Sequence, residues 1–239
     1  MRPFLPALLL LTVVPVVAFA QPGVAAVADC LPTAHGERYF VTLFGGQGDL
    51  FRPRTAHTWA TFVRTAVTPA GEQVVGEDTI SWLPATLNVR PWALRAETGV
   101  NLTLQETFEF MGSHRRQRVA VWGPYEITAE RYAQAMAQKA LLESGAVRYH
   151  SLGLFGRKAD VMHCIDGVTR TDPVWEKKAD PSRWYGEAGT GQATRAAVRS
   201  GFILNPTVTN DWIIQAINPT GYKLTPRNLN GRPLLGIVR

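Results

Sequence analysis

Residues 56–67, AHTWATFVRTAV, alternate between two side-chain faces with a period of two, the pattern of a half-buried β-strand. A segment rich in β-forming residues, 37–47, precedes this strand and ends near a double glycine. A turn at 68–73 and a third strand at 78–84 follow, and Pro84 ends that strand. Strands joined by short turns pair antiparallel, so this region predicts a hairpin or meander. One face of the central strand carries His57, Trp59, Thr61 and Val63.

Two later segments change to a helical period. Residues 128–145 form the clearest helix, with Thr128 as N-cap, an apolar face and Gly145 as its C-terminal stop. Residues 98–116 place apolar side chains at helical spacing, and we expect Asn101 to be the N-cap. These segments predict helices that follow the meander in the chain.

Further helices are expected at 161–170, with Asp160 as N-cap, and at 192–200. Strands and helices do not alternate as in a doubly wound sheet. The predicted class is therefore α+β, an antiparallel sheet with packed helices. Residues 37–170 are expected to form the core domain, and 171–239 a C-terminal extension packed on it.

The first twenty residues carry one cation, an apolar run and the sequence AFA before Gln21, which is the pattern of a cleaved signal peptide. Two prolines interrupt the apolar run, which is also too short for a membrane span of about 20 residues. We expect residues 1–20 to be a signal peptide, 21–36 a lead-in segment, and the mature chain to be exported without stable membrane insertion.

The charge and the motifs of the chain exclude several classes of function. The net charge is +6, but the cations are scattered, which does not favour nucleic-acid binding. The five histidines have no metal-binding spacing, and the chain has neither a serine-hydrolase elbow nor a nucleotide-binding glycine loop. The sequence therefore predicts neither a metal nor a cofactor.

The two cysteines, Cys30 and Cys164, leave three alternatives open for Cys164. It is a nucleophile near the start of a helix, where a thiolate is stabilised. It is the partner of Cys30 in a disulfide, which an oxidising compartment permits. Or it is a small buried hydrophobic residue.

The order of His57 and Cys164, a histidine on an early strand of a meander and a cysteine opening a later helix, resembles the circularly permuted papain-like fold. That group contains the lecithin:retinol acyltransferase-like proteins and the permuted NlpC-type cysteine hydrolases. Their Cys motif reads Asn-Cys-Glu-His followed by an apolar residue, and HCIDGV is similar to it at Cys164 and Val168. Tyr149 and Leu152 precede the Cys helix in a Tyr-x-x-Leu run of the kind seen in that family.

The resemblance extends over residues 37–170 and departs from the family at three positions. His163 stands where the family has Asn, Ile165 where it often has Glu, and Asp166 where it has the second His. The resemblance implies a permuted papain-like core.

The same resemblance implies roles for individual residues. Cys164 would be the nucleophile and His57 its general base. The third, orienting group would be a polar residue on the next strand, Thr79 or Ser81, which share one face. Backbone N–H groups at the start of the Cys helix would hold the developing oxyanion.

Trp59 and Trp82 are predicted to wall a substrate groove, with burial in the core as the alternative. The function expected from the resemblance is that of an exported cysteine-dependent hydrolase or acyltransferase acting on an amide or ester. A cell-wall peptide or a lipid would be the substrate. The alternative is a non-catalytic envelope binding or structural protein with a Cys30–Cys164 disulfide.

Overall fold

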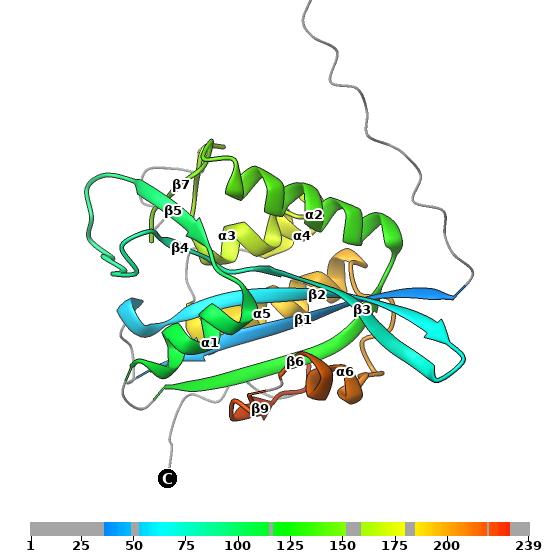
Figure 1. The fold of residues 1–239 in the computed structure, drawn as a ribbon. Helices are drawn as coiled ribbons and strands as arrows, with labels where there is room; N and C mark the ends of the chain where they lie inside the picture. Colours follow the sequence, from blue (N-terminus) through cyan, green and yellow to red (C-terminus); the bar gives the residue numbers. More distant parts are fainter. Residues whose placement is uncertain are drawn as a thin grey trace, which may run out of the picture. The chain divides into compact units, whose positions relative to one another are not determined.

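The structure is a computed structural model, and it describes residues 36–48, 53–114, 117–151, 159–179, 185–218 and 220–229. Residues 1–35 lie outside this part of the chain, and with them the predicted signal peptide and Cys30. Leu152 also lies outside it. The described residues contain helices and two mostly antiparallel sheets, which confirms the α+β class (Figure 1).

The larger sheet has five strands in the order β3-β2-β1-β6-β9. Their bounds are β1 Glu37–Gln47, β2 His57–Thr68, β3 Gly71–Ile80, β6 Arg118–Ile127 and β9 Leu224–Pro226. The first three strands pair antiparallel with their neighbours in sequence, as predicted for the meander. A short 3-10 helix, Pro53–Thr55, precedes β2.

A second sheet has the order β4-β5-β7-β8. Its strands are β4 Trp82–Pro84, β5 Glu97–Asn101, β7 Arg148–Tyr149 and β8 Val161–Met162. The single strand predicted at 78–84 is divided at Ser81, because the Ser81 N–H donates to the Asn101 side chain at 2.7 Å and leaves the ladder of β2. The chain therefore passes from one sheet to the other at Ser81.

The helices are α1 Leu104–Gly112, α2 Ala129–Glu143, α3 Cys164–Thr169, α4 Pro173–Lys178, α5 Gly186–Ser200 and α6 Asp211–Ile217. The predicted cap Thr128 is confirmed, because its hydroxyl accepts from the Arg131 N–H. The prediction that Asn101 caps a helix is wrong: Asn101 ends β5, and Thr103 caps α1 through a reciprocal pair with Glu106.

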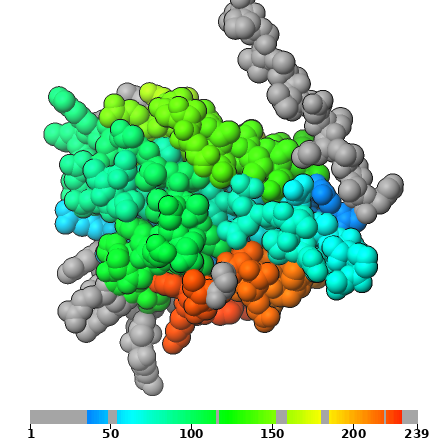
Figure 2. Space-filling view, in the orientation of Figure 1, coloured from blue at the N-terminus to red at the C-terminus, as the bar shows by residue number. Residues whose placement is uncertain are grey.

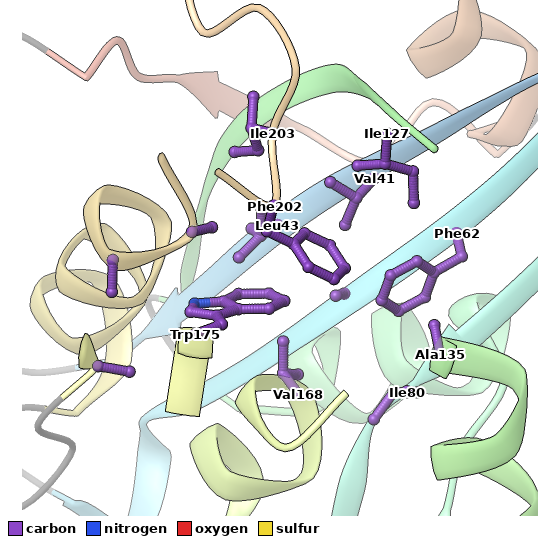
Figure 3. Close-up of a cluster of buried hydrophobic side chains, with 14 of the residues drawn as sticks. Val41, Leu43, Phe62, Ile80, Ile127, Ala135, Val168, Trp175, Phe202 and Ile203 are labelled. Carbon is purple, nitrogen blue, oxygen red and sulfur yellow. The ribbon is translucent and has the colours of Figure 1, made fainter. Parts of the chain in front are cut away.

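Helices cover both faces of the larger sheet. On one face, side chains of α2, α3, α4 and α5 pack on the central strands; Figure 3 shows Trp175 and Phe202 against Phe62 and Leu43 in this cluster. On the other face, α1 and α6 pack on a separate cluster that contains Trp59. Figure 1 shows α2 and α3 on one side of the sheet and α6 on the other. The sheet is therefore the middle layer of three.

The segment after residue 170 contributes to the same core. Strand β9 pairs in parallel with β6, and α5 packs on β1. The Glu187 carboxylate joins these elements, because Arg118 and Arg227 donate to its two oxygens at 2.9 and 2.8 Å. The C-terminal segment thus supplies a strand and a covering helix to the sheet that carries His57.

Candidate functional site

Cys164 is the first residue of α3 and is a free thiol with an accessibility between buried and exposed. The helix begins here because of His163, which is the N-cap in place of the predicted Asp160. His163 Nδ1 accepts from the Ile165 and Asp166 N–H groups, both at 3.1 Å, and the Asp166 carboxylate accepts from the His163 N–H at 3.5 Å. The HCID sequence is therefore a reciprocal cap that fixes where α3 starts.

The protein surroundings of Cys164 disfavour its ionised form. Burial raises the pKa of the thiol to about 11, although the Thr58 backbone N–H forms a hydrogen bond with the sulfur and lowers the pKa. The negative charge of Asp166 raises it further. The resting thiol is therefore protonated at neutral pH.

His57, the first residue of β2, is buried on the opposite side of the strand from α3. Its ring stacks on Trp59 with centroids 5.3 Å apart and meets Phe110 edge-on at 6.3 Å. Its Nε2 lies 2.8 Å from Ser81 Oγ, while Nδ1 has no hydrogen-bond partner within the structure. Burial lowers the pKa of His57 to about 3, so the imidazole is neutral at physiological pH.

A chain of hydroxyl groups extends from His57 to the start of α1. The Thr107 hydroxyl lies 2.8 Å from Ser81 Oγ and 2.7 Å from the Thr103 carbonyl, which can only accept. The Thr107 hydroxyl is in donor geometry toward both oxygens, and either ring tautomer of His57 fits the contact of Nε2 with Ser81 Oγ. His57 Nδ1 is buried and has no hydrogen-bond partner among the described residues.

The structure brings some of the predicted site residues together and separates others. His57 and Ser81 form the expected pair, whereas the Thr79 hydroxyl bonds to Thr61 at 2.9 Å and not to the imidazole. The Cys164 sulfur reaches the Thr58 backbone, one peptide from His57. No hydrogen bond joins the thiol and the imidazole, because α3 packs on the sheet face that carries Ala60, and His57 lies on the face of Trp59.

The two tryptophans predicted to wall a groove are both buried. Trp59 lies between the rings of His57 and Phe44. Trp82 packs against Gly99 of β5 and Gly167 of α3, where an added Cβ would collide with it or come within 3.0 Å of it. Their side chains belong to the interior in this state of the protein.

Sequence reasoning missed two contributors to this region. The backbone N–H of Thr58 contacts the sulfur, and Thr107 extends the hydroxyl chain from Ser81. A backbone contact leaves no trace in a side-chain pattern. Thr107 had one available signal: it lies one turn after Thr103 on the predicted helix, close to the apolar positions that face the sheet.

The raised pKa of Cys164 gives a pH prediction. Because only the thiolate reacts with iodoacetamide, alkylation of Cys164 is expected to rise about tenfold for each pH unit from 7 to 10 and to level off near pH 11. Peptide mass spectrometry at fixed reagent concentration measures this rate. A rate that is already at its plateau by pH 7 would contradict a protonated resting thiol.

Across the described part of the chain, no group of three or more His, Cys, Asp or Glu side chains is placed to hold a metal ion. A search of protein-family models found none that matches the chain, and searches of curated proteins and of solved structures found no significant match. The functional assignment therefore depends on the geometry around Cys164 and His57.

Proposed function

We propose that this chain is an exported cysteine-dependent hydrolase or acyltransferase with a permuted papain-like core, in which Cys164 is the nucleophile. One observation carries the proposal. A free thiol opens α3, and its sulfur lies against the Thr58 backbone, next to His57, whose Nδ1 has no hydrogen-bond partner among the described residues. Thiol acyl transfer needs at least a cysteine and a histidine that can reach each other.

The chemistry follows from the protonation states. Both groups are neutral at rest. In the tautomer that carries its proton on Nε2, His57 Nδ1 takes the thiol proton as the sulfur attacks the carbonyl carbon. The imidazolium returns this proton to the leaving alcohol or amine as the carbon–oxygen or carbon–nitrogen bond breaks. Water or another acceptor then attacks the thioester, His57 removes its proton, and the imidazolium returns this proton to the departing Cys164 sulfur. The imidazole and the thiol must move toward each other for this transfer, since they lie on different sides of β2.

Two of the backbone N–H groups at the start of α3, where we expected the oxyanion donors, already have a partner. The N–H groups of Ile165 and Asp166 already donate to His163 Nδ1. The backbone N–H of Cys164 itself is the donor we assign to the developing oxyanion. Peptide amides of the cell wall and lipid esters are the two substrate classes that we propose.

A non-catalytic binding or structural role is the second candidate, and the electrostatics favour it. Burial keeps both the thiol and the imidazole neutral, which is the state of inert interior residues. In the disulfide form of this candidate Cys164 would pair with Cys30, which lies outside the described residues.

Replacing His57 by Gln separates the two candidates. The Gln amide can keep the bond to Ser81 but cannot take a proton, so hydrolysis of a p-nitrophenyl ester is expected to fall by about 10²–10⁴-fold. Alkylation of Cys164 at pH 11, where the thiolate forms without a base, is expected to stay within about twofold of the wild type. Equal hydrolysis by the wild type and His57→Gln would remove His57 from the mechanism.

A further inference from the structure

The segment that joins β4 to β5, residues 85–96, exposes large apolar side chains. Trp92 is 79% exposed and Leu94 is 84% exposed, the two highest values among the large hydrophobic residues of the described chain. Leu87 on the same segment is 40% exposed. Figure 1 shows this segment projecting from one end of the second sheet, and Figure 2 shows it at the rim of the molecule. Single exposed apolar residues are common, but a tryptophan and a leucine two positions apart at a projecting tip indicate a contact surface.

Hydrogen bonds from the two residues that follow β7 hold residues 85–96 in place. His150 Nε2 donates to the Ala93 carbonyl at 2.9 Å, and the Ser151 hydroxyl donates to the Arg90 carbonyl at 2.9 Å. Val89 is buried with Leu83 and Leu102 in a small core of its own. The backbone under Trp92 and Leu94 is therefore fixed before binding, so docking on a partner does not need to order it.

The charges around the tip are mostly positive. Arg90 pairs with Glu97 at 2.9 Å, the Arg148 guanidinium donates to the neutral Ala96 carbonyl at 2.6 Å, and Arg95 is exposed. Within the segment and the side chains that hold it, three arginines therefore face one carboxylate. This set retains positive charge beside the two most exposed apolar residues.

We propose that Trp92 and Leu94 dock the protein on an anionic lipid surface, with the surrounding arginines on the lipid phosphates. Tryptophan and leucine side chains beside arginines are typical of protein surfaces that bind at the boundary between lipid headgroups and acyl chains. A narrow projecting tip with two apolar side chains suits that boundary better than the broad apolar core of a protein interface. Among the described residues no helix is long and apolar enough to cross a bilayer, and this docking needs none. The inference stands independently of the role of Cys164.

Vesicle binding by the purified full chain tests the proposal. Co-sedimentation is measured with vesicles of phosphatidylglycerol and phosphatidylcholine in equal amounts, and with phosphatidylcholine alone. We expect the double variant Trp92→Ala, Leu94→Ala to bind the anionic vesicles at least about tenfold more weakly than the wild type, because two apolar side chains leave the interface. Arg95→Gln is expected to weaken binding by about fivefold, and binding to fall with added salt.

The matched control is the double variant Leu204→Ala, Val208→Ala, which removes two apolar side chains that are 53% and 49% exposed between α5 and α6. This control is expected to bind the vesicles like the wild type. The N-terminal segment does not affect the comparison, because every variant contains it. Equal binding by the two double variants overturns the proposal. So does equal binding to both kinds of vesicle, or self-association that depends on Trp92 without vesicle binding.

Discussion

Replacing Cys164 by Ala is expected to reduce the hydrolysis of a p-nitrophenyl ester to the uncatalysed rate while the protein stays folded. The sulfur is the only atom that this change removes, and in the proposed mechanism it forms the bond to the acyl group. The helix cap remains, because His163 and Asp166 hold the start of α3 through backbone groups. Ester turnover and the thermal midpoint, measured on the same preparation, check both parts of the expectation.

Thr169→Ala is the matched control for Cys164→Ala. Thr169 lies on the same short helix and is fully buried, and its hydroxyl has no partner within the structure. Removing the hydroxyl and the methyl group of Thr169 is expected to leave turnover unchanged. Full activity in Cys164→Ala, or equal losses in both variants, would show that α3 supports the fold and supplies no nucleophile.

Replacing Trp175 by Ala is expected to lower the free energy of unfolding by about 3–5 kcal/mol. The side chain is fully buried in α4, its ring centroid lies 4.6 Å from that of Phe202, and its Nε1–H donates to the Ala193 carbonyl at 2.8 Å. The change leaves a cavity in the main core and removes the donor for a buried carbonyl. Denaturant unfolding followed by circular dichroism measures the loss.

Two further variants serve as comparisons for Trp175→Ala. Trp175→Phe keeps a ring in the core and loses the hydrogen bond, so a smaller loss of about 1–3 kcal/mol is expected. Val174→Ala changes the exposed neighbour and is expected to stay within about 0.5 kcal/mol of the wild type. If Trp175→Ala were as stable as Val174→Ala, the segment after residue 170 would not belong to the cooperative core.

Local patterns predicted much of the fold. The alternation in β2 and the cap at Thr128 are properties of neighbouring residues, and both elements form where the sequence placed them. The division of 78–84 at Ser81 was not predictable, because it depends on Asn101, which is distant in the chain. The parallel pairing of β9 with β6 is also long-range, and a three-residue strand has too short a pattern to detect.

The candidate site was predictable only in part. The two-residue period placed Thr79 and Ser81 on one shared face of their strand, and the structure pairs His57 with Ser81 but not with Thr79. The same period placed His57 beside Trp59, but it carries no information about which face of the sheet α3 would cover. The connections between the elements determine which face of the sheet α3 covers. Because α3 covers the face opposite His57, the imidazole is separated from the thiol of Cys164.

The acyl intermediate itself is the most direct test of Cys164 as a nucleophile. The wild-type protein is mixed with p-nitrophenyl acetate, quenched in acid within the first turnover and digested, and the peptide that contains Cys164 is examined by mass spectrometry. We expect an acetyl thioester on Cys164 that forms in the wild type, forms more slowly in His57→Gln and is absent in Cys164→Ala. Ester hydrolysis with no acetyl group on Cys164, or a Cys164 that is already oxidised in a disulfide, would contradict it.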